Sequence, residues 1–318
     1  MATATERMRG AVLGLRGDRP VIQTAGGIAD ASTGASCTLE TRFQIASVSK
    51  QFTAAAILLL EERGALSLAD PAGRWIEGCP QTWNDIGLHH LLTHTSGLVH
   101  WKDLPELDLT KRLDAREEIA IFQRTPLRSA PGAAWYYSSP GYVLLAHVVE
   151  NSSGRPYREF LAEEIFKPLE MASTFAGNGS GVRLAAGFAH GAPVPSFELD
   201  VVNMGTGDVW STVGDIARWD LGLAANRLFS ERSRQSILTS HALVEDPNFA
   251  PATGYGFAWF AGDIGGRRAL YHPGDNAGFQ SLNAWLVDDD VRIIVLSNDE
   301  ETDIHLLVAE MLAVILSG

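Results

Sequence analysis

The sequence is poor in cysteine and in basic residues. Its two cysteines, Cys37 and Cys79, are too few and too isolated for a disulfide framework or a metal cluster, so we expect two buried thiols. Lysine and arginine number 25 against 38 acidic residues, which leaves a net charge of -13. This balance argues against nucleic acid or an anionic membrane surface as a partner, because both need concentrated basic patches. A small-molecule substrate is the partner that the composition leaves open.

Long apolar runs are also missing. No window approaches the roughly 18 apolar residues of a membrane span, and residues 1–7 lack a basic region followed by an apolar run. We therefore expect no membrane span and, for the chain as written, a cytoplasmic location. A chain trimmed of its signal peptide would look the same and would be periplasmic or secreted.

Motifs of several large enzyme classes are absent. The sequence has no Gly-x-Ser-x-Gly elbow, no P-loop and no dinucleotide-binding glycine fingerprint. His89, His90 and His94 invite a metal-site interpretation. However, adjacent histidines point apart on a helix, and no acidic or cysteine ligand is suitably spaced. We therefore expect neither a metal ion nor a cofactor.

What the sequence does contain is a serine and a lysine three residues apart at a predicted helix start. Residues 48–62 are rich in strong helix formers, and Gly64 stands where a glycine would end the helix. Residues i and i+3 share a helix face, which places the Lys50 amine within reach of the Ser47 hydroxyl. A lysine kept partly neutral by burial could take the serine proton and so activate a nucleophile.

This pair has an ordinary alternative. Ser47 could be a plain N-cap and Lys50 a solvated helix residue. Against this, lysine is rare in the chain and occurs elsewhere only at Lys102, Lys111 and Lys167. A lysine inside an otherwise apolar helix is therefore less easily taken as incidental.

Two further segments could complete a site. Residues 131–142 are dense in aromatics and turn formers. Tyr137 could share a proton there with Ser47 or Lys50, or these aromatics could simply pack the loop. Residues 271–278 form a strand end that meets a glycine-rich loop, where backbone N–H groups can approach a ligand. The alternative for this second segment is a hairpin connection.

Strand patterns at both ends of the chain flank a helical middle. The predicted strands are residues 11–16, 21–27, 255–260, 268–272, 280–286 and 292–296. The predicted helices beyond the first are residues 113–123, 141–151, 157–166, one that starts near residue 211, and 303–316. These patterns predict an α+β fold with one antiparallel sheet flanked by helices.

The order of these elements predicts two parts. We expect a sheet domain built from both termini, residues 1–66 and 203–318. Residues 67–202 would be inserted as a mostly helical domain. An active site would lie in the cleft between the two parts.

Five short motifs follow one another along the chain. They are Ser47-x-x-Lys50, His94-Thr95-Ser96-Gly97-Leu98, Pro131-Gly132 with Trp135 and Tyr137-Ser138-Ser139, Pro168-Leu169-Glu170-Met171, and His272-Pro273-Gly274. In this order they resemble the serine β-lactamase and penicillin-binding protein superfamily, in the branch of class C β-lactamases, D-aminopeptidases and related esterases. The resemblance covers nearly the whole chain, and it implies an antiparallel sheet flanked by helices with a helical domain beside it.

The resemblance also implies a role for each motif. Ser47 would be the acylated nucleophile, Lys50 its proton partner, and Tyr137 the general base or acid. Residues 272–274 would lie on the edge strand that faces the substrate. The backbone N–H groups of Ser47 and Asp275 would form the oxyanion hole, where negative charge develops in a tetrahedral intermediate.

Two motifs depart from the pattern of the family that the chain resembles. Ser139 stands where the branch usually has asparagine, and a hydroxyl cannot hold a substrate amide and the lysine together as a carboxamide can. His272, followed by Gly274, stands where β-lactamases have lysine, and histidine is largely neutral at pH 7. We therefore expect a serine hydrolase that acts on small carboxylic esters or on D-amino-acid amides and peptides. The alternatives are a β-lactamase or D-Ala-D-Ala carboxypeptidase, or a non-enzymatic sensor that binds penicillin or peptidoglycan fragments.

Overall fold

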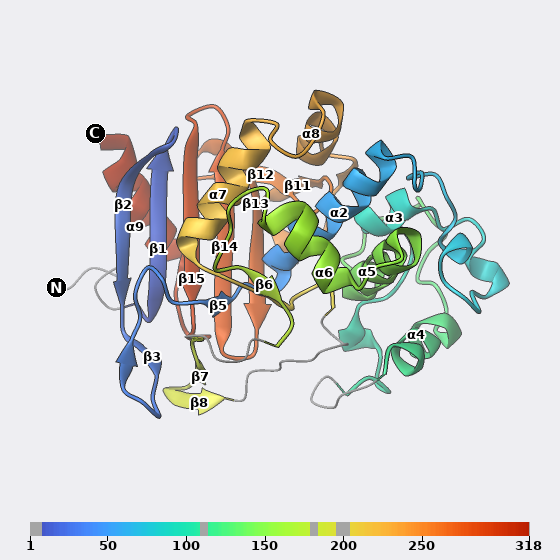
Figure 1. Cartoon of the computed structure of the whole chain (residues 1–318), viewed down its shortest axis with the longest axis horizontal. Helices are drawn as coiled ribbons and strands as arrows, with labels where there is room; N and C mark the ends of the chain where they lie inside the picture. Colours follow the sequence, from blue (N-terminus) through green and yellow to red (C-terminus); the bar gives the residue numbers. More distant parts are fainter. Residues whose placement is uncertain (1–7, 109–113, 179–183, 195–203, 318) are drawn as a thin grey trace.

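The computed structural model describes residues 8–108, 114–178, 184–194 and 204–317 (Figure 1). Its main layer is an eight-stranded antiparallel sheet with the strand order β10-β11-β12-β13-β14-β15-β1-β2. The predicted α+β fold is thereby confirmed. The strands are β1 (Gly10–Arg16), β2 (Arg19–Gly26), β10 (Ala242–Leu243), β11 (Ala252–Tyr255), β12 (Phe260–Ile264), β13 (Arg267–Asn276), β14 (Phe279–Leu286) and β15 (Val291–Ser297).

The two ends of the chain meet inside this sheet, because β1 pairs with β15 on one side and with β2 on the other. The two strands predicted at residues 11–16 and 21–27 correspond to β1 and β2, which are joined by a turn in which Gly17 has a φ of 61°. A positive φ of this kind carries no steric penalty for glycine. Three of the strands predicted near the C-terminus lie within β13, β14 and β15.

The fourth predicted strand near the C-terminus, residues 255–260, is wrong. These residues span the end of β11, a buried turn and the start of β12. Ala258 has a φ of 62° in this turn, and the N–H of Gly256 donates to the carbonyl of Trp259 at 2.7 Å. The aromatic side chains are almost fully buried. The segment therefore has the aromatic composition of a strand, but packing of its aromatic side chains in the core holds it as a tight connection.

Helices cover both faces of the sheet (Figure 1). On one face, α7 (Val213–Ala224) packs against β15 and β1, and α2 (Lys50–Glu62) belongs to the same core. On the other face, α9 (Ile304–Ser317) packs against β1, β2 and β15. The apolar side chains accordingly form two core clusters, one for each face. None of the helices in the described ranges is long and apolar enough to cross a membrane.

The remaining helices of the middle of the chain gather beside α2, away from β1 and β2 (Figure 1). They confirm the helices predicted near residues 113–123, 141–151 and 157–166, although residue 113 lies outside the described residues. The helix α8 (Glu231–Leu238) was not predicted. The helices are α3 (Leu88–Leu92), α4 (Ala115–Arg124), α5 (Ser139–Ser153) and α6 (Tyr157–Leu161), the last continued by a π-helical turn at Ala162–Phe166.

The division of the chain into two domains stays a proposal. The sheet contains strands from both ends of the chain, as a domain formed by residues 1–66 and 203–318 would require. The boundary proposed between residues 202 and 203 lies outside the described residues.

Short strands place the start of α2. β5 leads into a 3₁₀ turn at Ala46–Ser49, which runs directly into α2, and β5 is held by pairing with β9. α2 is central to the fold, since every residue in its first three turns is buried. The helix ends as predicted, because Gly64 follows it with a φ of 69°. The strands outside the main sheet are β3 (Ile28–Asp30), β4 (Ala35–Ser36), β5 (Phe43–Gln44), β6 (Phe175–Ala176), β7 (Gly187–Ala189), β8 (Ala192–Val194) and β9 (Val209–Ser211).

Candidate active site

Ser47 lies in the 3₁₀ turn that precedes α2. The residue before it, Ala46, is buried and has a φ of 47°, a left-handed conformation that costs a non-glycine residue about 1–3 kcal/mol. Such strain persists only where the surrounding structure enforces it. The sharp turn presents Ser47 at the N-terminal end of the helix, where unpaired amides favour negative charge.

Lys50 is the immediate partner of Ser47. Its Nζ donates to Ser47 Oγ at 3.0 Å and to the carbonyl oxygen of Thr206 at 3.0 Å. The Lys50 side chain is fully buried, and burial lowers its pKa well below the ordinary value of 10.5, although the negative charge of Asp208 opposes this shift. The structure therefore contains the predicted serine–lysine pair, with an amine that burial drives toward its neutral, proton-accepting form.

Asp208 is a neighbour of Lys50 that the sequence did not point to. It is buried, and its Oδ1 accepts a hydrogen bond from the N–H of Gly205 at 3.0 Å. Burial raises the pKa of Asp208 to about 6, even though the charges of Arg158 and Lys50 lower it. Above that pH, the Asp208 carboxylate stabilises the protonated form of Lys50.

Tyr137 lies beside this pair, with its ring centroid 5.1 Å from Lys50 Nζ. Burial raises the pKa of Tyr137 well above its ordinary value, and a hydrogen bond with Ser47 opposes only part of this shift. The Tyr137 phenol therefore keeps its proton at neutral pH. This state suits a proton donor better than a general base.

His272 is held in a chain of buried hydrogen bonds. The N–H of Ser138 donates to His94 Nδ1 at 3.2 Å, so the proton of the His94 ring is on Nε2, which lies 3.1 Å from the Tyr255 hydroxyl. The Tyr255 hydroxyl lies 3.2 Å from His272 Nε2, and His272 Nδ1 lies 2.7 Å from the carbonyl oxygen of Pro273. These contacts assign the directions of donation: His94 to Tyr255, Tyr255 to His272, and His272 to Pro273.

This chain limits what His272 can offer a substrate. Both of its ring nitrogens have a partner within the protein. Burial, together with the charge of Lys50, lowers the pKa of His272 to about 3. His272 is consequently neutral at physiological pH and brings no positive charge to the site.

A further histidine, His100, stands next to Ser139. The N–H of Ser139 donates to His100 Nδ1 at 3.3 Å. Burial and the charges of Lys50 and Lys102 lower the pKa of His100 to about 3, so this ring is neutral as well. The sequence did not point to His100, because its partner is 39 residues away along the chain.

The last three predicted residues belong to β13. This strand pairs with β12 only as far as Tyr271, and beyond it the described structure pairs β13 with β14 alone. Residues 272–276 therefore present a free edge on the β12 side, although β13 is an inner strand of the sheet and not the edge strand that the resemblance implied. Gly274 fits against the nucleophile turn: a Cβ atom at this position would lie 2.5 Å from the carbonyl oxygen of Ile45 and 3.0 Å from the amide nitrogen of Ser47.

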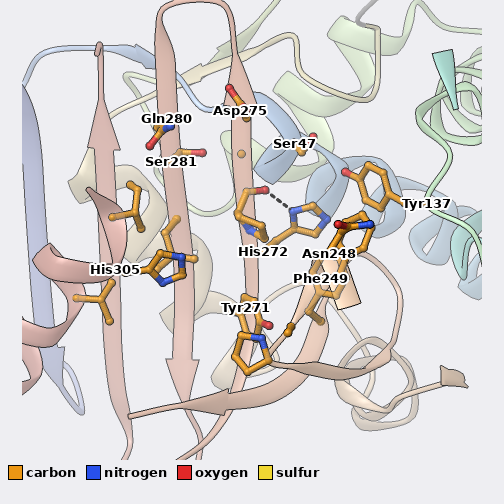
Figure 2. Close-up of a pocket in the computed structure, with 18 of the residues that line it drawn as sticks. Ser47, Tyr137, Asn248, Phe249, Tyr271, His272, Asp275, Gln280, Ser281 and His305 are labelled. Atoms are coloured by element: carbon orange, nitrogen blue, oxygen red, sulfur yellow. Dashed lines mark hydrogen bonds between the residues drawn. The ribbon is translucent and has the colours of Figure 1, made fainter. Parts of the chain in front are cut away.

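A cavity of about 950 Å³ opens at this free edge (Figure 2). Figure 2 shows Ser47 and Tyr137 on one side of β13, with Gln280 and His305 on the other. Lys50 lies buried behind Ser47 rather than in the wall. The structure thus brings the predicted residues together, since the cavity wall contains Ser47, Tyr137, Ser139, His272, Gly274 and Asp275.

Comparisons with known proteins agree with this geometry. A family model described as beta-lactamase matches residues 2–313. Penicillin-binding protein 4* of Bacillus subtilis is 31% identical over 281 residues, which cover 81% of this chain and 61% of that protein. An esterase of Burkholderia gladioli, EstB, is 33% identical over 187 residues, which cover 54% of this chain and 47% of the esterase. The chain therefore spans about half to three fifths of the length of these two relatives.

Among solved structures, a penicillin-binding protein from Bacillus halodurans superposes with a TM-score of 0.82 at 28% sequence identity. The match covers 98% of this chain and 96% of that one. The family model spans nearly the whole sequence, and the structural match extends over the same length. The chain therefore belongs to the beta-lactamase family.

Proposed function

We propose that the protein is a serine hydrolase that forms an acyl-enzyme on Ser47. The observation that carries this proposal is the 3.0 Å contact between Ser47 Oγ and the amine of a fully buried lysine whose pKa is lowered. A serine hydroxyl becomes a useful nucleophile when a neighbouring base takes its proton. The names of the relatives, which include an esterase and a D-aminopeptidase, support the same reaction class.

In the proposed reaction, Ser47 Oγ attacks the substrate carbonyl carbon while its proton passes to the neutral amine of Lys50. The carbonyl oxygen becomes an oxyanion, which the N–H groups of Ser47 and Asp275 would stabilise. Tyr137 donates its phenol proton to the leaving group as the carbon–heteroatom bond breaks, and Lys50 returns a proton to Tyr137. Water then attacks the acyl-enzyme by the reverse route, which releases the acid and restores Ser47.

The proposed substrates are small esters, or D-amino-acid amides and peptides, that lack a free carboxylate near the reacting bond. His272 is neutral and fully hydrogen-bonded, so it cannot supply the fixed charge that would hold a carboxylate. Lys102 is the only lysine or arginine in the cavity wall described. Four aspartates share this wall with it: Asp246, Asp263, Asp275 and Asp303. An anionic substrate would meet net repulsion there.

The proposal is tested by covalent labelling. A fluorophosphonate probe should label the protein at Ser47, and Ser47→Ala should abolish labelling and lower the hydrolysis of p-nitrophenyl butyrate by about 10⁴-fold or more. Ser139→Ala is the matched control, because it removes a hydroxyl from the same cavity and should leave labelling intact. Labelling that persists in Ser47→Ala would contradict the assignment.

Two other readouts separate the proposal from its alternatives. Faster turnover of nitrocefin than of p-nitrophenyl butyrate would indicate a β-lactamase or carboxypeptidase instead. A stable mass adduct with penicillin, with no turnover of any substrate, would indicate a sensor.

A further inference from the structure

The cavity at Ser47 continues around the free edge of β13 to the opposite face of the sheet. Side chains alternate between the two faces of a strand. On β13, Gly274 faces Ser47, whereas Tyr271 and Pro273 belong to the face on which α9 packs. The wall of this second arm is formed on β13 by Tyr271 and Pro273, on β14 by Leu282, and on α9 by Val308, Ala309 and Leu312. We call this space the α9 arm.

Aromatic rings connect the α9 arm to the candidate nucleophile. The Tyr137 ring lies 5.4 Å from the ring of Phe249, which lies 5.5 Å from that of Phe260, which in turn lies 5.7 Å from that of Tyr271. Figure 2 shows Phe249 beside β13 between Tyr137 and Tyr271. An apolar chain attached at Ser47 would therefore meet an unbroken aromatic wall as it passes the strand edge.

The arm is bounded at its far end. The β12–β13 hairpin reaches α9 there, because a Cβ atom on Gly265 would lie 3.1 Å from Leu312 Cδ1. Three of the aspartates in the cavity wall, Asp263, Asp275 and Asp303, are exposed. The whole cavity, at about 950 Å³, is near the upper end of the roughly 300–1,000 Å³ of small-molecule sites. It has more room than the acyl group of a short ester would fill.

We propose that the α9 arm binds the apolar chain of the acyl group, so that the protein prefers esters of medium-length, uncharged acids over acetate. This inference rests on the proposed function, because it names a substrate class for the Ser47 site. Burial of each added methylene in such a channel raises the specificity constant by about two- to fourfold until the channel is full. A carboxylate at the end of the chain is disfavoured, because the aspartates near the arm repel it.

The first test measures kcat/KM for p-nitrophenyl acetate, butyrate and octanoate. The ratio of octanoate to acetate should exceed tenfold in the unmodified protein. Ala309→Trp, which fills the arm from an exposed position on α9, should lower this ratio about tenfold. Ala313→Trp is the matched control, because it places the same side chain one turn further along α9 at an exposed position outside the cavity wall. It should leave the ratio unchanged.

The second test does not depend on turnover. The uncharged dye Nile red should bind to Ser47→Ala with a saturable rise in fluorescence, and adding Ala309→Trp should abolish this rise while adding Ala313→Trp should not. If Ala309→Trp abolished dye binding in a protein that hydrolyses no ester, the α9 arm would be supported as an apolar binding site and the proposed hydrolase function would be refuted. If the protein hydrolysed esters and the octanoate-to-acetate ratio of kcat/KM were equal in both tryptophan variants, the role of the α9 arm would be refuted and the hydrolase function would be supported.

Discussion

The two faces of β13 differ sharply although they belong to the same short stretch of chain. On the face toward Ser47, His272, Gly274 and Asn276 are each held against a neighbouring segment. His272 is bonded to Tyr255, Gly274 touches the nucleophile turn, and the Asn276 amide donates to the carbonyl of Gly207 at 3.1 Å. On the face toward α9, Pro273 and Asp275 are exposed, and Tyr271 is held by the stacking of its ring on Phe260.

This difference shows how one strand can serve two purposes. The alternation of side chains puts neighbouring residues on opposite faces, so they experience different constraints. Chemistry at Ser47 needs groups held within a fraction of an ångström, which close packing and satisfied hydrogen bonds provide. Accommodation of a substrate chain needs apolar surface with few fixed partners. We therefore expect substitutions on the Ser47 face to impair reactions with all substrates and those on the α9 face to change the preference among them.

Among substitutions that compare the two faces of β13, the largest effect should come from Gly274→Ala. The added methyl group would clash with the carbonyl of Ile45 and the amide of Ser47. This clash can be relieved only by displacing the nucleophile or the strand. A displacement of about 1 Å can cost roughly 10²-fold in rate, so kcat/KM should fall by about 10²-fold for short and long esters alike. Overpacking should also lower stability by about 1–3 kcal/mol.

Pro273→Ala is the control for this variant, because the neighbouring side chain is exposed on the opposite face. It should retain kcat/KM for p-nitrophenyl acetate, whose acyl group does not reach the α9 arm, within about threefold, and lose less stability than Gly274→Ala. Equal losses in the two variants would contradict the proposed difference between the faces.

A smaller, but still general, effect is expected for Tyr255→Phe. This change removes the hydroxyl that joins His94 to His272 and leaves two buried ring nitrogens without a partner. Loss of such a buried hydrogen bond costs about 1–3 kcal/mol, which urea unfolding would show, and kcat/KM should fall for all esters because His272 is no longer held. Tyr157→Phe removes another buried hydroxyl, which bonds to Thr53 at 2.7 Å. If Tyr157→Phe lowered kcat/KM as much as Tyr255→Phe, the hydrogen-bond chain would have no special role.

The pH dependence of the reaction tests the state of Lys50. Burial lowers the pKa of Lys50, so the amine becomes a base, and kcat/KM rises, as pH increases through that lowered value. Asp208, whose own pKa is about 6, is charged above that pH and raises the pKa of Lys50. Asp208→Asn removes this charge, so the rising limb of the pH profile should move to lower pH. A limb that moved to higher pH, or did not move, would show that Lys50 is not the group that titrates.

Much of this site could be predicted from the sequence, because its main elements are local. Ser47 and Lys50 share a helix face, and Tyr137 precedes a helix that the turn residues mark clearly. The position of residues 272–274 beside the substrate came from the resemblance alone, since the strand pattern ended at residue 272 whereas β13 continues to Asn276. Ser139, His272, Gly274 and Asp275 then lie in one cavity wall, as expected from the order of motifs.

The residues that were missed depend on contacts between distant parts of the chain. Tyr255 bonds to His94, which lies 161 positions earlier in the chain. Its segment was wrongly predicted to be a strand, because a fully buried turn can contain the same aromatic residues as a strand. His94 drew attention as a metal-ligand candidate and as the first residue of one motif, but with no role assigned to it, whereas its ring bonds to Tyr255 and Ser138. Asp208 carries no local pattern at all. The cavity on the second face of β13 could not be predicted either, because that face meets α9, which comes from the end of the chain.

That second face carries the smallest expected effect, at Asp275. Burial and the charge of Glu300 raise the pKa of this carboxyl, whose side chain is exposed at the rim of the cavity. Asp275→Asn should change kcat/KM for neutral esters by less than about twofold, because exposed charges contribute little to an uncharged reaction. It should speed the reaction with anionic nitrocefin by about two- to fivefold, with the gain shrinking as salt is added. Asp18→Asn removes an equal charge from the exposed β1–β2 turn. If that distant change gave the same gain, net charge rather than the position of Asp275 on this face would control the preference.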